Sequence, residues 1–327
     1  MAAVSDRPTL VTGGAGYVGS VLVDALLASG RRVRVLDSLL HGDLGSLASV
    51  ADEQAFEFVR GDVRDQASRL AALDGCSEVV HLAAIVGDPA CARDETLARE
   101  TNLEATEALV RDAKSVGVDR FVFLSTCSNY GKLEEGGLAT ETWALNPLST
   151  YAETKVAAEM AVLSNSGNGY AATCLRLATV YGTSPRMRFD LTVNEFTRDA
   201  LLSRGLVVYG EQFWRPYVHV RDAARAISAV LDAPVDAVRS EVFNVGNTNE
   251  NYRKLDIVEM LQDRVPGTAV DYVHRDEDPR DYRVSFEKIG AALGYETRHT
   301  VSDGIDEVIE LLQSRRIEDP FSDVYRN

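Results

Sequence analysis

The sequence predicts an α/β fold built on a doubly wound parallel sheet, with a smaller C-terminal domain. Short apolar runs alternate with helical patterns from residue 8 to about 180, which is typical of βαβ units. A glycine-rich turn separates the first run from the first helix, as in parallel sheets that bind nucleotides. The six runs expected to form strands are Thr9–Val11, Arg32–Leu36, Phe56–Val59, Val79–Leu82, Arg120–Leu124 and Ala172–Leu177.

Helices are expected between these strands, and a region with few strand signals follows them. A helix is expected from about Tyr17 to Ala28, and apolar stripes between Leu103 and Val116 and between Ala152 and Ala161 predict two more. Residues 183–216 carry few strand signals and are expected to form an inserted region that covers a substrate. The rest of the chain is expected to supply a helix at Ala223–Leu231, a strand at Val242–Gly246, and helices with one strand at Ala269–Val273.

These patterns predict two domains. Residues 1–180 and about 217–247 are expected to form a dinucleotide-binding domain, and residues 181–216 and 248–327 a substrate-binding domain.

Composition excludes several classes of partner. The chain of 327 residues has 50 acidic and 34 basic residues and a formal net charge of −16, so its overall field repels nucleic acid and anionic membranes. No apolar stretch reaches the roughly 20 residues of a membrane helix, and no signal-peptide pattern opens the sequence. We therefore expect a cytoplasmic protein, and an anionic small ligand would need a local basic patch.

The cysteines give no sign of a metal site or of a disulfide framework. Cys76, Cys91, Cys127 and Cys174 are widely separated and form no C-x-x-C motif, and no histidine stands at ligand spacing. We expect no metal, and each cysteine is by default a small buried apolar residue.

The glycine turn predicts a site for the pyrophosphate of a dinucleotide. Gly13, Gly16 and Gly19 stand between the first strand and first helix, with Tyr17 and Val18 at the start of the helix. Glycines at this spacing allow a tight turn and a close approach of backbone N–H groups to phosphate at the helix N-terminus. This pattern is typical of a Rossmann-like domain.

Asp37 predicts NAD rather than NADP as the cofactor. It ends the second strand about 20 residues past the glycines, where a carboxylate accepts hydrogen bonds from the adenosine ribose and repels a 2′-phosphate. No arginine follows at 38 or 39 to receive such a phosphate. The other residues expected to line the cofactor site follow the third and fourth strands: Asp62, Val63, Leu82, Ala83 and Ala84.

A tyrosine and a lysine on one helical face predict the reaction centre. Tyr151 and Lys155 are four residues apart, and Thr126 ends the fifth strand at the edge where such sheets bind ligands. The attraction between an ammonium and a phenolate about 4 Å apart is worth about 4 kcal/mol at an effective dielectric of about 20, which would lower the pKa of the phenol by roughly three units. Tyr151 is therefore a candidate base, Lys155 its activator and a cofactor ligand, and Thr126 the residue that orients it.

Motifs along nearly the whole chain resemble the extended short-chain dehydrogenase/reductase family, in particular its NAD-dependent nucleotide-sugar epimerase and dehydratase branch. The matching motifs are Thr12–Gly19, Gly61-Asp62-Val63, His81–Ala84, Tyr151–Lys155, Arg176 with Val180-Tyr181-Gly182, Arg215–Asp222 and Phe243–Gly246.

The resemblance implies NAD in the first domain and a nucleoside diphosphate sugar in the second. It also implies that Arg215 and Arg275 grip the diphosphate, which would supply the local basic patch, because a guanidinium donates two parallel hydrogen bonds to phosphate. Arg280 and Asn194 are further candidates for substrate contact. The family implies a homodimer formed by the helices near 103–116 and 151–165.

Departures from the family pattern narrow the expected activity. The 4,6-dehydratases carry an Asp-Glu pair after the threonine, whereas Cys127 and Ser128 stand there in this chain, so dehydration is disfavoured. Decarboxylases usually carry a glutamate where Ser128 stands, and Ser128 is expected to contact substrate. GDP-fucose synthase and GDP-mannose 3,5-epimerase have a proton-transferring cysteine at the position of Cys127, but residues 183–194 offer only Arg186 and Arg188 as its partner.

The sequence thus predicts an epimerase that inverts C4 of a UDP- or dTDP-linked hexose through a transient 4-keto sugar. One alternative is a reductase or 3,5-epimerase of a 4-keto-6-deoxy sugar that uses Cys127. The other is a dinucleotide-sensing scaffold without catalysis, against which Tyr151 and Lys155 argue.

Overall fold

The computed structural model describes residues 6–41, 43–133, 137–167, 169–203, 205–276 and 281–327. Its centre is a seven-stranded sheet in the order β10-β6-β5-β4-β1-β2-β3, and every neighbouring pair is parallel. The strands are β1 (Thr9–Thr12), β2 (Val33–Asp37), β3 (Phe56–Arg60), β4 (Glu78–His81), β5 (Arg120–Thr126), β6 (Ala171–Leu177) and β10 (Val242–Val245). The expected Rossmann-like doubly wound sheet is confirmed, and the order reverses between β1 and β4, where such sheets bind ligands.

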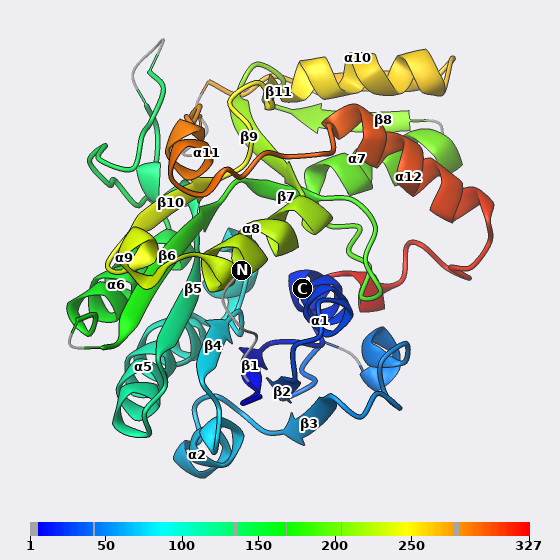
Figure 1. The fold of residues 1–327 in the computed structure, drawn as a ribbon. Coiled ribbons are helices and arrows are strands. Elements are labelled where there is room, and N and C mark those ends of the chain that lie inside the picture. The colour runs from blue at the N-terminus through cyan, green and yellow to red at the C-terminus, as the bar shows by residue number, and fades with distance from the viewer. Residues whose placement is uncertain (1–5, 42, 134–136, 168, 204, 277–280) are drawn as a thin grey trace.

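Helices cover both faces of this sheet (Figure 1). Helix α1 (Tyr17–Ala28) packs with α8 (Val220–Asp232) on one face, in a core that includes Leu22 and Ile227. The other face carries α2 (Gln66–Leu73), α5 (Ala105–Ser115) and α6 (Thr150–Ser164) over a second core. Because both faces are buried, strands such as β6 are apolar almost throughout rather than alternating.

Two small sheets form the rest of the molecule. One has the order β11-β9-β7, and the other pairs β12 with β8. Their strands are β7 (Thr179–Tyr181), β8 (Gly205–Tyr209), β9 (Trp214–His219), β11 (Asn251–Arg253) and β12 (Ala269–Val273). The helices beside them are α7 (Thr192–Leu202), α10 (Lys254–Arg264), α11 (Glu287–Leu293) and α12 (Val301–Gln313).

The region 183–216 has more regular structure than its sequence suggested. It contains α7, β8 and the start of β9, and β8 pairs in parallel with β12, whose first residue Ala269 lies opposite Gly205. Such pairing between distant segments leaves no local signal beyond the alternation of buried Leu206 and Val208 with exposed Val207 and Tyr209.

Short elements complete the chain between the larger ones. These are η1 (Leu44–Leu47), α3 (Asp88–Arg93), α4 (Glu95–Arg99), the π-helical turn η2 (Glu100–Glu104), η3 (Cys127–Tyr130), α9 (Val235–Val238) and η4 (Asp323–Tyr325). The last of them brings the C-terminal residues back to the start of α1 (Figure 1). Within the described ranges, no helix combines the length and apolar character needed to cross a membrane.

Candidate active site

The glycine turn packs so closely that side chains would not fit in it. Gly13 has a φ of +72°, and a Cβ there would lie 2.7 Å from the backbone nitrogen of Ala83. A Cβ on Gly19 would lie 2.2 Å from the Gly13 carbonyl oxygen. Helix α1 begins at Tyr17 without a side-chain cap, so its first N–H groups are free to bind an anion.

Asp37 lies at the end of β2 beside this turn. Its carboxylate accepts hydrogen bonds from the backbone N–H of Ala15, at 3.0 Å, and of Leu39, at 2.8 Å. These bonds fix the carboxylate where the sequence expected a ribose to bind.

All residues expected to bind the cofactor line one cavity of about 520 Å³. They come from the ends of β1, β2, β3 and β4, from the first turn of α1 and from α6, and they meet because the carboxyl ends of parallel strands share one edge of the sheet. They are Gly13, Gly16, Tyr17, Val18, Gly19, Asp37, Asp62, Val63, Leu82, Ala83, Ala84 and Lys155. The glycines of the turn, which carry no side chains, and the uncapped N-terminus of α1 fit the pyrophosphate of a dinucleotide.

The three expected catalytic residues, Thr126, Tyr151 and Lys155, line the same cavity. Tyr151 and Lys155 stand near the start of α6, which Ser149 caps by accepting a hydrogen bond from the N–H of Ala152. The ammonium of Lys155 is buried, donates to the Leu124 carbonyl at 2.9 Å and lies 4.6 Å from the centre of the Phe123 ring.

The acidity of the tyrosine is set mainly by burial. Burial raises the pKa of Tyr151, and the acidic groups of Cys91 and Asp88 act in the same direction. Arg188 and a hydrogen bond with Thr126 lower the pKa of Tyr151. Burial lowers the pKa of Lys155 to about 8. In the chain alone, desolvation therefore keeps the pKa of Tyr151 above its usual value, opposite to the lowering that the sequence suggested.

A hydroxyl cluster stands next to Tyr151. Thr126 accepts a hydrogen bond from the backbone N–H of Ser128 at 3.1 Å and donates its hydroxyl to the Ser128 Oγ at 3.1 Å. The Ser128 Oγ in turn lies 3.2 Å from the Tyr282 hydroxyl. Ser128 and Tyr282 both line the cavity, so these hydroxyls can hold a sugar near Tyr151.

Cys127 does not reach the cavity. Its side chain is fully buried, its thiol donates to the Arg176 carbonyl at 3.2 Å, and burial raises the pKa of the thiol well above its usual range. The thiol is thus engaged within the chain, and this position does not favour proton exchange with a ligand in the cavity.

Asn194 is fully buried and does not line the cavity. Its side-chain oxygen accepts from the Gly182 N–H at 3.0 Å, and its amide donates to the Arg188 carbonyl at 2.9 Å, to the Gly182 carbonyl at 3.2 Å and to the Tyr17 hydroxyl at 3.2 Å. Its polar atoms are thus engaged within the chain, at the loop after β7 and the start of α1, and contact with a substrate stays a prediction.

The arginines expected to grip a diphosphate lie outside the cavity wall. Arg215 is buried, and its guanidinium lies 5.7 Å from the Tyr282 ring, directly beside a lining residue. Arg275 is exposed and lies 5.3 Å from the ring of Tyr209. Arg280 falls outside the described residues.

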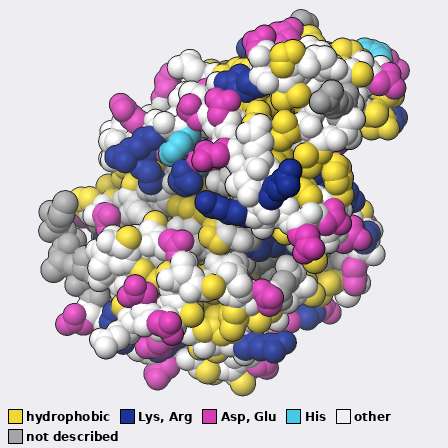
Figure 2. All heavy atoms as spheres, turned by 90° about the vertical axis from the view of Figure 1, so that its right-hand side faces the viewer, with side chains coloured by type: hydrophobic (Ala, Val, Ile, Leu, Met, Phe, Trp, Pro, Cys, Tyr) yellow, Lys and Arg dark blue, Asp and Glu magenta, His cyan; other side chains and the backbone are white. Residues whose placement is uncertain are grey.

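Several lining residues had not been expected. Tyr282, Arg186, Arg188 and His41 line the cavity, although they come from loops far apart in sequence. No local pattern in the sequence marks the two arginines as lining residues, and only the fold brings them to the same cavity as the glycine turn. On the face of the molecule that Figure 2 shows, Lys and Arg side chains form small separate groups, with Asp and Glu side chains scattered among them.

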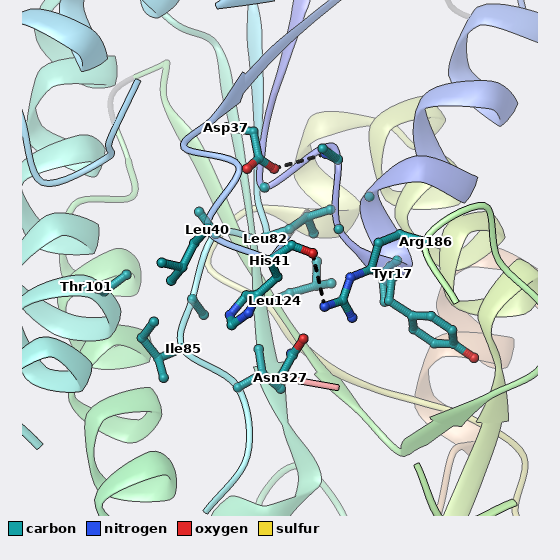
Figure 3. Close-up of a pocket in the computed structure, with 18 of the residues that line it drawn as sticks. Tyr17, Asp37, Leu40, His41, Leu82, Ile85, Thr101, Leu124, Arg186 and Asn327 are labelled. Atoms are coloured by element: carbon teal, nitrogen blue, oxygen red, sulfur yellow. Dashed lines mark hydrogen bonds between the residues drawn. The ribbon is translucent and has the colours of Figure 1, made fainter. Parts of the chain in front are cut away.

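The segment after β4 is held by an amide in the π-helical turn η2. Asn102 is buried; its oxygen accepts from the Ile85 N–H at 2.8 Å, and its amide donates to the Ile85 carbonyl at 2.9 Å. Ile85 lines the cavity (Figure 3). These two hydrogen bonds fix the backbone of Ile85 in the cavity wall. The sequence patterns gave no role to this segment.

The fold and cavity define a dinucleotide-dependent enzyme, and comparison with known proteins supplies its family. Residues 9–246 match the model of the NAD dependent epimerase/dehydratase family, and the chain belongs to this family. It is 31% identical to dTDP-glucose 4,6-dehydratase of Streptomyces niveus, over 94% of this chain and 93% of the relative. It is 30% identical to UDP-glucose 4-epimerase of Mycolicibacterium smegmatis, over 94% and 99%.

A solved structure agrees with this result. UDP-glucuronic acid 4-epimerase from Bacillus cereus, in complex with UDP-glucuronic acid and NAD, has 26% identity and a TM-score of 0.82, covering 94% of this chain and 99% of that one. The cofactor is NAD, and the chain is an enzyme that modifies nucleoside diphosphate sugars.

Proposed function

We propose that the protein inverts C4 of a UDP- or dTDP-linked hexose or uronic acid. The observation that carries this proposal is the set of acidic side chains in the cavity. Among the described lining residues, the acidic side chains are Asp37, Asp43 and Asp62, which stand at the end of β2 and in the loops after β2 and β3, where the adenosine is expected. The lining side chains from the end of β5 and from η3, Ser125, Thr126 and Ser128, carry hydroxyls, which suit binding and proton transfer at one carbon rather than elimination of water.

The chain's own residues have distinct parts in this reaction. Tyr151 takes the proton of the sugar 4-hydroxyl while C4 is oxidised, and it returns the proton after the 4-keto sugar has turned its other face. Thr126 orients the tyrosine hydroxyl, and Ser128 with Tyr282 positions the sugar. When bound, NAD supplies a hydride acceptor and a positive charge that favours the tyrosinate.

The smaller sheets form the substrate-binding part in this proposal, as expected for residues 181–216 and 248–327. Arg215 beside Tyr282 is the candidate for the diphosphate at the cavity. Arg275, on the exposed segment after β12, would reach it only if that segment folds over the ligand.

The second activity that the sequence left open, a 3,5-epimerase or reductase that uses Cys127, has weaker support. The thiol is bonded to the Arg176 carbonyl and does not line the cavity. A non-catalytic scaffold has little support either, because Thr126, Tyr151 and Lys155 all line the cofactor cavity.

A product assay tests the proposal. The purified enzyme is incubated with UDP- and dTDP-hexoses and uronic acids without added reduced nicotinamide, and the products are separated by chromatography and assigned by NMR. With the reaction run in deuterated water, a C4-inverted sugar that carries no deuterium at C3 or C5 supports the proposal. A 4-keto-6-deoxy product, deuterium at C3 or C5, or no product from the whole panel would contradict it.

We also propose a homodimer formed through α5 and α6. Support comes from Met160 on α6, a residue that is 69% exposed, and from half-exposed Val156 and Ala157 on the same helix. A Met160→Glu variant is expected to shift the molecular mass measured by light scattering toward the monomer. We place the protein in the cytoplasm, where its four free, buried cysteines would stay reduced.

A further inference from the structure

The loop between β7 and α7 is fastened to the first turns of α1. The Tyr17 hydroxyl donates to the Gly182 carbonyl at 2.6 Å, and the Ser184 hydroxyl donates to the Tyr17 carbonyl at 2.7 Å. The Ser184 and Ser20 hydroxyls lie 3.1 Å apart. These bonds fix the loop against the helix N-terminus that the glycine turn presents.

Arg186 extends from this loop across the cavity toward His41 (Figure 3). Its Nη2 donates to the Arg326 carbonyl at 2.9 Å and to the His41 carbonyl at 3.4 Å. Three segments that are distant in sequence are thereby joined over one end of the cavity: the loop after β2, the loop after β7 and the C-terminal residues. Arg186, His41 and Asn327 all line the cavity.

One nitrogen of the Arg186 guanidinium has no hydrogen-bond acceptor in the described part of the chain. Its Nη1 is buried and has no hydrogen-bond partner, and no ion pair with a carboxylate is found for it among the described residues. Two other lining arginines differ in this respect, because Arg188 pairs with Asp190 at 2.7 Å and Arg64 pairs with Asp62 at 2.7 Å. Burial and the charge of Arg188 lower the pKa of Arg186.

A buried guanidinium nitrogen such as Nη1 of Arg186 is costly to leave without an acceptor, and a bound anion would remove that cost. The location indicates which anion would bind. Arg186 lies beside the uncapped N-terminus of α1, and His41 follows Asp37 by four residues on the loop at the adenosine end. Arg215 and Arg275, the candidates for a substrate diphosphate, do not line this cavity.

We propose that Arg186 binds the pyrophosphate of NAD and, through its bonds to the His41 and Arg326 carbonyls, closes the cofactor end of the cavity so that NAD stays bound between turnovers. A planar fork suits both tasks, because one edge can bind the two carbonyls while the other binds phosphate oxygens. This proposal depends on NAD as the cofactor and not on which sugar carbon is inverted.

The test compares Arg186→Gln and Arg186→Lys with a matched control, Arg32→Gln. Arg32 has a side chain that is 49% exposed, and it precedes β2 at the opposite edge of the sheet. Calorimetry gives the dissociation constants of NAD, ADP-ribose, adenosine and UDP for each variant. The NAD content of the purified proteins and the rate of NAD release into excess ADP-ribose are measured in parallel, with thermal unfolding as the control for folding.

Removing a charged hydrogen bond to phosphate is expected to weaken NAD and ADP-ribose binding about 10- to 100-fold in Arg186→Gln. The release of NAD should be correspondingly faster. Arg186→Lys should lie between Arg186→Gln and the unmodified enzyme, because it keeps the charge but loses the fork. Adenosine and UDP should bind within about twofold of the unmodified enzyme.

Two results would overturn the proposal. The first is unchanged NAD affinity and release in folded Arg186→Gln or Arg186→Lys. The second is a loss of UDP affinity as large as the loss for NAD, which would assign Arg186 to the diphosphate of the substrate. Neither result depends on epimerase activity, so failure of this proposal and failure of the proposed function can be told apart.

Discussion

The Ser128 Oγ and the Tyr282 hydroxyl lie 3.2 Å apart, although 154 residues separate them in the sequence. Ser128 belongs to η3 at the end of β5, in the large sheet, whereas Tyr282 follows the segment after β12. Both residues line the cavity, so this contact joins the cofactor-binding part of the chain to the part expected to hold the substrate.

This contact predicts an effect of Tyr282→Phe on substrate binding rather than on chemistry. Losing one hydrogen bond from a hydroxyl weakens binding by about 1 kcal/mol. KM for the nucleotide sugar should therefore rise about fivefold, while kcat changes less than twofold. Steady-state kinetics on the unmodified enzyme and the variant measures both. A large fall in kcat with unchanged KM would instead place Tyr282 in the chemical step.

Tyr151→Phe is expected to abolish most of the activity without releasing the cofactor. Loss of a general base lowers rates by about 10²- to 10⁴-fold, and the phenol oxygen is the only group removed. The kcat and the NAD content of the purified variant should be measured together. Retention of more than a tenth of the activity would remove Tyr151 from its proposed role.

Lys155→Met is expected to make the protein more stable and inactive. The pKa of Lys155 is lowered by burial from 10.5 to about 8, so at pH 7 the folded chain holds a buried charge at a cost of about 3 kcal/mol. After allowance for the lost hydrogen bond to Leu124, the free energy of unfolding at pH 7 should rise by about 1–2 kcal/mol.

The pH dependence of the same variant gives a check with a defined sign. Between pH 8 and 10.5 the unfolded lysine binds more protons than the folded one, so this group adds stability to the unmodified protein as pH rises. The advantage of Lys155→Met should therefore shrink over that interval in urea unfolding. An advantage that stays constant from pH 7 to 10 would show that the charge of Lys155 is not the cause.

His81 predicts a loss of stability in mild acid. Its ring is buried between Thr12, at 2.6 Å from Nδ1, and Thr106, at 2.9 Å from Nε2, and burial lowers its pKa from 6.5 to about 3. Below pH 6.5 the unfolded histidine binds the proton first. The free energy of unfolding should thus fall by up to about 1.4 kcal/mol per pH unit from this residue.

The control for His81 is the variant His81→Asn. Measurements between pH 5 and 6.5 avoid Glu307, whose pKa is lowered from 4.5 to about 2 by the hydrogen bond from His219, against the opposing effect of burial. In this interval the variant should be less stable overall but should show a flatter dependence on pH. An equal slope in both proteins would assign the acid sensitivity to other groups.

Much of the cofactor site could be predicted from the sequence because its residues are local to strand ends. The expected helix from Tyr17 to Ala28 matches α1, and each expected strand from β1 to β6 is present. The glycine turn, Asp37 and the pair Tyr151 and Lys155 depend on short spacing, which periodicity and turn chemistry encode directly.

The substrate side could be predicted less well because its contacts join distant segments. Asn194 looked available for a ligand, but its polar atoms bind the loop after β7. Proton transfer by Cys127 was an open alternative, yet its side chain is fully buried and its thiol donates to the Arg176 carbonyl. Strand β8 and the residues Arg186 and Tyr282 had little local pattern to reveal them.

The sequence by itself determined the parallel sheet and the glycine turn, and it placed Tyr151 and Lys155 on one helical face, because these depend on periodicity and on spacing within about twenty residues. Only the tertiary structure decided which polar groups face the cavity and which are engaged within the chain. Arg186 faces the glycine turn because loops separated by more than a hundred residues pack together, and local sequence carries no information on such packing.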